Sequence, residues 1–240
     1  MLPLALIALL VPAQAQQPQQ QPARTPAGAP LHPIITEVLY AVPRGPEGDA
    51  NRDGLRDALG DEFVELYNPH DKPIRLDGYT INDRNPPGSN QVSFVFPRFE
   101  LPPRAVVVVF NGVNQTWTGP VGDSTKAPDK PHDDFDGAWV FTMSNTSKST
   151  GLANDGDWVV LLDAKGEPVS CVTWGKTDTP PPFPDSVVER APNASAGSVQ
   201  RTQPLAGSPF TAHPTVGGLR FSPGTPPGGR QASAPTDEGR

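Results

Sequence analysis

The sequence predicts an all-β protein, built as an antiparallel sandwich with long loops, and three observations support this fold class. Short runs of apolar and β-branched residues recur between residues 31 and 221, with turn-forming residues between them. Proline or glycine interrupts most windows long enough to hold a helix, because the 240-residue chain contains 32 prolines and 23 glycines. About nine short strands separated by turns are typical of antiparallel sandwiches and barrels.

The strands are predicted from alternating or continuous apolar runs. They cover residues 34–42, 62–68, 74–81, 91–96, 105–110, 138–143, 158–163, 169–174 and 198–202. Gly166 lies between the seventh and eighth runs, as expected for a hairpin connection. Two connections, residues 111–137 and 175–197, are long, and we expect both to fold back across the sandwich. Trp117 would anchor the first, and the Pro-Pro-Pro-Phe-Pro run at 180–184 would stiffen the second.

The ends of the chain differ in composition from the middle. Residues 1–15 resemble a signal peptide, because a short apolar run is followed by Ala13-Gln14-Ala15, although no Lys or Arg precedes the run. Either the true start lies upstream or this is a hydrophobic stretch of another kind. Residues 16–30 are predicted to be a disordered Gln/Pro-rich linker, 31–224 the folded domain and 225–240 a disordered Pro/Gly-rich tail. We therefore expect a secreted, periplasmic or cell-envelope protein without a transmembrane anchor.

Charge and cysteine content narrow the function classes. Nineteen basic and 26 acidic residues give a formal charge of −7, and this negative charge opposes binding to nucleic acid. We therefore expect a protein or cell-surface partner. Cys171 is the one cysteine in the sequence, so no intramolecular disulfide is possible. It lies in an apolar run and is predicted to be an inert core residue.

The order of several motifs resembles a known family. These motifs are Ile-Ile-Thr-Glu-Val at 34–38, Asp-Glu-Phe-Val-Glu-Leu-Tyr-Asn at 61–68, Leu-Asp-Gly-Tyr-Thr-Ile-Asn-Asp at 76–83, the run 101–110, Leu-Ala-Asn-Asp-Gly-Asp-Trp at 152–158 and Gly-Ser-Val-Gln-Arg at 197–201. Together they resemble the lamin tail domain, found in nuclear lamins and in many exported bacterial proteins. The resemblance implies an immunoglobulin-like β-sandwich that acts as a module without catalysis.

An acidic loop is the best candidate site. Asp49, Asn51 and Asp53 carry side-chain oxygens at alternate positions, and Gly54 allows the sharp turn that a calcium loop needs after its third ligand. The twelfth position, Gly60, cannot be the closing ligand. The predicted ligands of a structural Ca²⁺ are Asp49, Asn51, Asp53, the carbonyl of Leu55, Asp57, and Asp61 or Glu62 as the closing ligand. The alternative is a solvated loop rich in Asx turns that binds nothing tightly.

The leading hypothesis is an exported, non-enzymatic binding or scaffolding module stabilised by calcium. One alternative is a divalent-metal-dependent secreted hydrolase of the phosphodiesterase or nuclease type, or an accessory module of one, using His132, Asp133, Asp134 and Asp136. Another is adhesion to glycans or cell surfaces through tryptophans. Trp117, Trp139 and Trp174 are the candidates, but the last two lie in predicted strands and are expected in the core.

Overall fold

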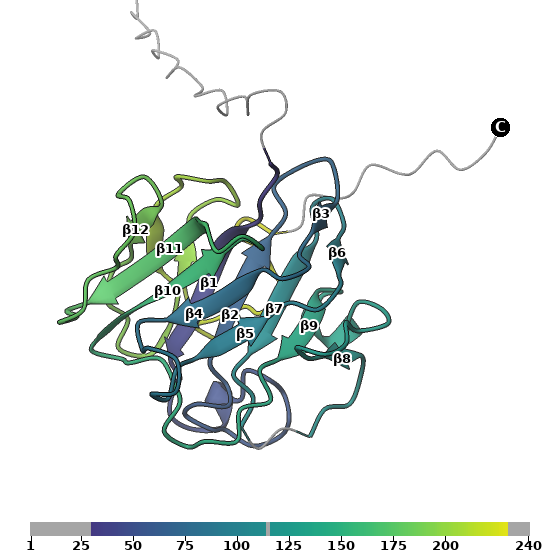
Figure 1. The fold of residues 1–240 in the computed structure, drawn as a ribbon. Helices are drawn as coiled ribbons and strands as arrows, with labels where there is room; N and C mark the ends of the chain where they lie inside the picture. The colour runs from purple at the N-terminus through teal and green to yellow at the C-terminus, as the bar shows by residue number, and fades with distance from the viewer. Residues whose placement is uncertain (1–29, 114–115, 230–240) are drawn as a thin grey trace, which may run out of the picture. The chain divides into compact units, whose positions relative to one another are not determined.

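The computed structural model describes residues 30–113 and 116–229, which form two facing β-sheets and a small additional sheet (Figure 1). The larger sheet has the order β14-β13-β1-β2-β7-β9-β8. Its strands are β1 (Ile34–Ala41), β2 (Phe63–Tyr67), β7 (Val106–Phe110), β8 (Val121–Gly122), β9 (Trp139–Thr142), β13 (Gly197–Arg201) and β14 (Phe210–Ala212).

The second sheet has the order β12-β11-β10-β4-β5. Its strands are β4 (Thr80–Asp83), β5 (Ser93–Val95), β10 (Gly156–Leu162), β11 (Pro168–Gly175) and β12 (Val188–Arg190). A two-stranded sheet pairs β3 (Ile74–Arg75) with β6 (Glu100–Leu101). The helical elements in the described ranges are two 3-10 turns, η1 (Pro46–Gly48) and η2 (Asp133–Phe135).

The predicted all-β, immunoglobulin-like sandwich with long loops is confirmed, with one correction to its antiparallel character. β9 runs parallel to both β7 and β8, and β12 runs parallel to β11. The physical reason lies in the two long connections, since parallel neighbours require a crossover of about a dozen residues or more. Residues 111–138 and 176–187 supply that length after β7 and after β11.

The prediction of one strand at residues 74–81 is wrong. Gly78 has a φ of 77°, and the N–H of Tyr79 donates to the carbonyl of Leu76 at 2.9 Å. This turn divides the segment into β3 and β4, which belong to different sheets. Glycine adopts the left-handed conformation at no steric cost, so the chain can reverse here.

The main core lies between the two large sheets. Ile35, Val64 and Val107 of the larger sheet are fully buried, as are Val159 and Val172 of the second sheet. At one end of this core the rings of Tyr40 and Trp174 stack 4.2 Å apart at an angle of 4°. Cys171 is fully buried, and burial raises the pKa of its thiol to about 12, which leaves it protonated and inert.

The outer face of the larger sheet is buried as well, so β1 has no exposed residue along its eight positions. Leu39 and Phe63 on this face share a second apolar cluster with Phe135 from the loop after β8 and Phe221 from the C-terminal segment. Trp117 packs on Phe110 with ring centroids 5.5 Å apart. The expectation that this connection folds back onto the sandwich is therefore confirmed for its described residues 116–137.

The connection at 175–197 also folds back, onto the outer face of the second sheet. Phe183, in the proline-rich run, meets Trp158 edge to face with centroids 5.5 Å apart. Trp158, Val160 and Cys171 form the small cluster that this loop covers. Aromatic pairs of this geometry stabilise a contact beyond the area they bury.

The predicted signal peptide (1–15), nearly all of the predicted linker (16–30) and residues 230–240 of the predicted tail lie outside the described residues. Within the part that the structure describes, no helix has the length and apolar character needed to cross a membrane.

Candidate functional site

The acidic loop between β1 and β2 curls around Asp49. Its two carboxylate oxygens accept the N–H groups of Asp53 and Gly54 at 3.1 and 2.9 Å. Gly54 has a φ of 89°, a conformation that glycine adopts easily, so the chain can turn sharply here. The side chains of Asp49 and Asn51 thus both reach the N–H of Asp53.

The next carboxylates and amides tighten the curl. Asn51 Oδ1 accepts the N–H of Asp53 at 3.0 Å, and Asp53 Oδ1 accepts the N–H of Leu55 at 2.8 Å. Asp57 Oδ1 accepts the N–H of Leu59 at 2.9 Å. Burial, together with the charges of Asp49 and Asp57, raises the pKa of Asp53, so these carboxylates lie close enough to repel one another.

Asp61 closes the loop. Its side chain is fully buried, with one oxygen accepting the N–H of Asn51 at 3.0 Å and the other the N–H of Asp57 at 2.6 Å. Burial, with a contribution from the charge of Asp49, raises the pKa of Asp61 to about 7. One carboxylate thus joins Asn51 and Asp57, the third and ninth residues of the loop counted from Asp49.

Glu62 faces away from this loop. Its carboxylate accepts the N–H of Leu152 at 2.9 Å and the side-chain amide of Asn111 at 3.1 Å. Burial raises its pKa well above the usual range, and the charges of Asp157 and Asp83 add to the effect. The other five side chains predicted as ligands thus lie in one hydrogen-bonded loop, and Glu62 is directed away from it.

The donor set of the loop is composed of oxygen atoms alone, which suits a hard cation such as Ca²⁺. Leu55, whose carbonyl is one of the predicted ligands, is 60% exposed. In residues 30–113 and 116–229 no three His, Cys, Asp or Glu side chains are gathered in an arrangement that could hold a metal ion. The loop oxygens are directed at backbone N–H groups instead.

The second acidic cluster caps a 3-10 turn. His132 is buried and caps η2, where its Nδ1 accepts the N–H of Asp134 at 3.3 Å and its ring meets Phe135 edge-on. Burial lowers the pKa of His132. Asp136, in the left-handed conformation, accepts a hydrogen bond from the hydroxyl of Thr225. His132 and Asp136 are therefore used in local structure.

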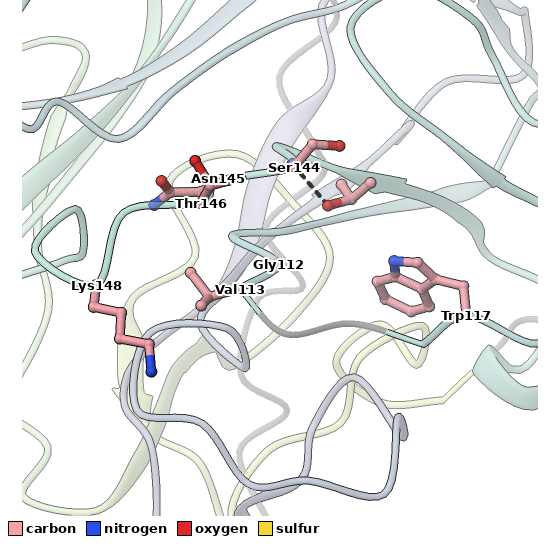
Figure 2. Close-up of a pocket in the computed structure, with 8 residues that line it drawn as sticks. Gly112, Val113, Trp117, Ser144, Asn145, Thr146 and Lys148 are labelled. Carbon is pink, nitrogen blue, oxygen red and sulfur yellow. Dashed lines mark hydrogen bonds between the residues drawn. The ribbon is translucent and has the colours of Figure 1, made fainter.

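A cavity of about 470 Å³ lies beside the ends of β7 and β9 (Figure 2). Its walls come from the segment after β7 and from residues 142–148. The lining residues are Gly112, Val113, Trp117, Thr142, Ser144, Asn145, Thr146 and Lys148. Of the three tryptophans considered for adhesion, Trp117 lines this cavity, Trp174 is fully buried and Trp139 packs on Phe99.

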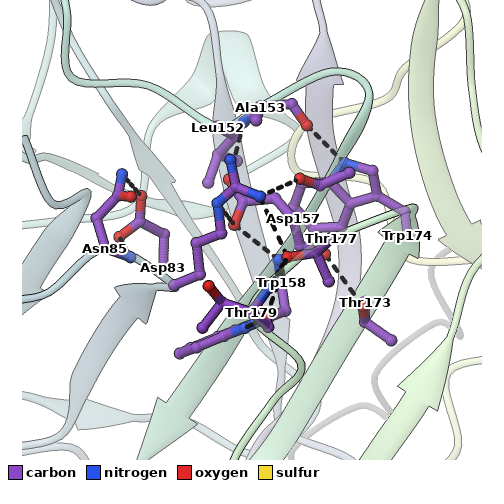
Figure 3. Close-up of polar contacts among 12 residues, drawn as sticks. Asp83, Asn85, Leu152, Ala153, Asp157, Trp158, Thr173, Trp174, Thr177 and Thr179 are labelled. Carbon is purple, nitrogen blue, oxygen red and sulfur yellow. Dashed lines mark hydrogen bonds and ion pairs between the residues drawn. The ribbon is translucent and has the colours of Figure 1, made fainter.

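A buried polar network joins the ends of β4 and β10 (Figure 3). Asp157 accepts the N–H groups of Ala153 and Trp158, each at 2.8 Å, and lies 3.6 Å from the guanidinium of Arg84. Asp83 accepts both the N–H and the side-chain amide of Asn85 at 3.0 Å. Burial, with the charge of Asp157, raises the pKa of Asp83 to about 7. The network gives these acids structural roles at strand ends.

Two glutamates face each other directly across β1 and β2. Glu37 and Glu65 are register partners, and both are fully buried. Glu37 accepts the hydroxyl of Ser198 at 2.7 Å and the N–H of Ser222 at 2.9 Å. Glu65 accepts the N–H of Gly224 at 2.8 Å. Sequence reasoning missed this pair because its donors come from distant C-terminal segments.

The comparisons with known proteins agree with the fold. No curated protein matches the sequence. The model of the lamin tail domain matches residues 26–176, more than half of the 240-residue chain. That family consists of immunoglobulin-like domains without enzymatic activity. The chain therefore belongs to the lamin tail domain family.

Proposed function

We propose that this protein is an exported, non-enzymatic binding or scaffolding module whose loop between β1 and β2 is stabilised by calcium. The observation that carries the calcium part is the curl of this loop around Asp49, with Asp53, Asp57 and Asp61 close by. Four carboxylates of like charge in one loop repel one another, and a divalent cation would turn that repulsion into attraction.

The proposed ligands follow the geometry of the loop. They are side-chain oxygens of Asp49, Asn51, Asp53 and Asp57 with the carbonyl of Leu55, and Asp61 as the closing ligand. Asp61 is favoured over Glu62 because Glu62 is hydrogen-bonded to Leu152 and Asn111 outside the loop. Extracellular calcium sites bind with dissociation constants of about 10⁻⁴–10⁻³ M, so an exposed loop of this kind can be filled outside the cell.

The bound ion would have a structural task. Ala50 is buried in the second apolar cluster, and Arg56 donates to the carbonyls of Val42 and Pro43, each at 2.9 Å. Through Ala50 and Arg56 the loop already packs against the end of β1 and the outer face of the larger sheet. Calcium would fix the acidic side chains of the loop around these two contacts.

Calcium is expected to raise the melting temperature of the purified full chain. A site tenfold above its dissociation constant adds about 1.4 kcal/mol, which corresponds to about 3–6 °C in a domain of this size. The measurement is a thermal melt in millimolar calcium and in chelator. Asp49→Asn combined with Asp53→Asn should abolish the shift, while the matched pair Asp133→Asn and Asp134→Asn should keep it. An equal melting temperature in calcium and chelator would contradict the metal site.

Export is supported by the apolar run and the Ala13-Gln14-Ala15 pattern of residues 1–15. Expression of the full chain in a bacterial host should give a mature protein that begins at Gln16. Mass spectrometry of the exported fraction would measure this N-terminus directly. Uncleaved chain confined to the cytoplasm would contradict the proposal.

The non-enzymatic role is supported by the family, and its test is a screen for phosphodiester hydrolysis. The chain should not hydrolyse nucleic acid or a model phosphodiester with calcium or magnesium. Metal-dependent turnover that Asp134→Ala abolishes would instead establish the hydrolase alternative.

A further inference from the structure

A series of hydrogen bonds connects the buried Glu37 of β1 to a histidine beyond β14. Glu37 is fully buried, and its Oε2 lies 3.0 Å from the hydroxyl of Ser222. The same hydroxyl lies 2.8 Å from Nε2 of His213, which is 8% exposed. An acid, a hydroxyl and an imidazole from three distant parts of the sequence thus form one continuous hydrogen-bonded group.

The second ring nitrogen of His213 limits the protonation states of the imidazole. Its Nδ1 lies 2.5 Å from the carbonyl oxygen of Pro214, and a carbonyl oxygen can only accept a hydrogen bond. Nδ1 therefore carries a proton. With Nε2 unprotonated the ring is neutral and accepts from Ser222, and with Nε2 protonated the ring is a cation and donates to Ser222.

Ser222 links the protonation of the two ends, because its hydroxyl carries one proton and two lone pairs. One lone pair accepts the side-chain amide of Gln200 at 3.1 Å. The hydroxyl can then donate to only one of Glu37 and His213 and must accept from the other. Both hydrogen bonds form when Glu37 is protonated and His213 neutral, or when Glu37 is a carboxylate and His213 a cation. In either case the group holds one proton besides those on the hydroxyl and on Nδ1.

The two forms interconvert without gain or loss of a proton. The Oε2 proton of Glu37 moves to the oxygen of Ser222 while the hydroxyl proton of Ser222 moves to Nε2 of His213, so the serine stays neutral. Burial raises the pKa of Glu37 and favours its neutral form, and the charge of His213 acts against this rise. The hydroxyl of Ser198 and the N–H of Ser222, which donate to Oε1 at 2.7 and 2.9 Å, favour the carboxylate.

The residues that face Glu37 from the neighbouring strands supply no positive charge. β13 places the uncharged Gln200 opposite Glu37, and β2 places Glu65 opposite it on the other side. Glu65 accepts the N–H of Gly224 at 2.8 Å. Within the described residues, His213 is thus the cationic partner in this hydrogen-bonded cluster, and the C-terminal segment provides the contacts to both acids.

We propose that Glu37, Ser222 and His213 form a proton-sharing latch that holds the segment 221–225 on the larger sheet while the three side chains retain one proton between them. This segment adds Phe221 to the second apolar cluster, so its release would uncover part of that face of the sheet. The latch goes beyond the proposed binding role and depends neither on calcium nor on export.

The latch is expected to be strongest within a window of pH. In the released segment, a glutamate and a histidine titrate near their ordinary pKa values of about 4.3 and about 6.5. Above about 6.5 the open state holds no proton, so closing takes one up and the latch weakens as pH rises. Below about 4.3 the open state holds two, so closing expels one and the latch weakens as pH falls. Beyond either limit the closing equilibrium changes by up to about tenfold per pH unit.

Amide hydrogen exchange of the full chain, followed by NMR in chelator, tests the window. The probes are the N–H groups of Ser222 and Gly224, which donate to Glu37 and Glu65. The reference is the N–H of Asn68, bonded to a backbone carbonyl at 3.0 Å in the same sheet. Corrected for the intrinsic exchange rate and relative to Asn68, protection of both probes should be about tenfold or more lower at pH 8 than at pH 5.5.

Two hydroxyl variants separate the latch from general loosening of the segment. Ser222→Ala removes the bridging hydroxyl and keeps the N–H that donates to Glu37, so the relative protection should lose most of its dependence on pH. Thr225→Ala is the matched control, because this hydroxyl of the same segment donates to Asp136 outside the latch, and the dependence on pH should remain.

The imidazole ¹⁵N resonances of His213 report the shared proton directly. In Glu37→Gln the side-chain amide imitates the protonated acid and donates to Ser222, so His213 should bind a proton at Nε2 at least about tenfold less tightly than in the unaltered chain. Ser222→Ala supplies the same comparison should Glu37→Gln fail to fold, because it leaves the other donors to Glu37 in place.

The latch is disproved if relative protection of the Ser222 and Gly224 amides depends on pH equally in Ser222→Ala and in the unaltered chain, or if Thr225→Ala abolishes the dependence as fully. It is also disproved if Nε2 of His213 titrates alike in the unaltered chain and in the variants. The calcium melts that test the proposed function use different residues, so either idea can fail without the other.

Discussion

Arg201 carries a charge into the interior, and its donors are satisfied there. Its side chain is 1% exposed and donates to the carbonyl of Ile35 at 2.6 Å and to that of Ser208 at 2.8 Å. The guanidinium also pairs with Glu189 and lies 4.6 Å from the centre of the Phe210 ring. One side chain thereby links β13 to β1, β12 and β14. A buried charge is tolerated only when it is paired and hydrogen-bonded in this way.

Replacing this arginine should be among the most destabilising single changes in the domain. Arg201→Met leaves two carbonyls and one carboxylate without their donors, which is expected to cost about 3–5 kcal/mol. Urea denaturation followed by tryptophan fluorescence would measure the loss. Arg75→Met is the matched control, because Arg75 pairs with Asp77 at the surface with 70% of its side chain exposed, and stability should stay unchanged. Equal losses in the two variants would contradict this account.

At the scale of elements, the sandwich extends beyond the segment that defines the family. The match to the lamin tail domain ends at residue 176, yet β13 pairs with β1 and β12 pairs with β11. The segment at 221–225 adds the ring of Phe221 to the second cluster and donates to both buried glutamates. These C-terminal elements complete both sheets.

A chain truncated after residue 176 should therefore fail to fold cooperatively. It would leave an edge of β1 unpaired and Glu37 and Glu65 without their C-terminal donors, and unpaired edges and buried charges are both unfavourable. A chain truncated after residue 229 should melt like the full chain. Circular dichroism melts of the two truncations test this, and a sharp transition for the shorter chain would disprove the requirement.

The length of each element explains how much of the fold the sequence could predict. β1, β2, β7, β10 and β11 carry clear apolar runs of five to eight residues and were predicted. β6 and β8 have two residues each and β12 and β14 three, too few for any periodicity to appear. Such strands exist because a neighbouring strand supplies their hydrogen bonds, and that information is not local.

The same limit applies to the acidic loop. Contacts within the loop, from Asp49 to Asp61, follow from nearby residue types and could be anticipated. The direction of Glu62 could not, because its partners Asn111 and Leu152 lie 49 and 90 residues further along the chain. The cavity at Trp117 likewise depends on β7 and β9 being parallel neighbours, which local sequence does not reveal.

At the scale of the whole molecule, the buried acids determine how stability depends on pH. Burial raises the pKa of Glu37, Glu62, Asp83 and Asp157, and that of Asp83 reaches about 7. In the unfolded chain the pKa of an aspartate is about 3.9. The folded state therefore holds these protons more tightly, and the contribution of these acids to stability declines as pH rises from about 4 through 7. The lowered pKa values of His32 and His132 act in the opposite direction below about 6.5.

The melting temperature should accordingly be higher at pH 5 than at pH 8, measured in chelator so that calcium does not contribute. Each pKa unit corresponds to about 1.4 kcal/mol, so a difference of at least about 5 °C is expected. Asp83→Asn keeps an acceptor for the N–H of Asn85 and removes the ionisation, so the difference should shrink. A melting temperature that rises from pH 5 to pH 8 would reverse the sign and refute the argument.

The position of β1 between β2 and β13 determines when the larger sheet can finish folding. Its neighbours are β2, which follows directly, and β13, so that Glu37 meets Gln200 across 163 residues of chain. Contacts between such distant segments form slowly and cannot form on the ribosome until nearly all of the polypeptide has emerged. The pairing of β1 on both of its edges is therefore among the last steps of folding during synthesis.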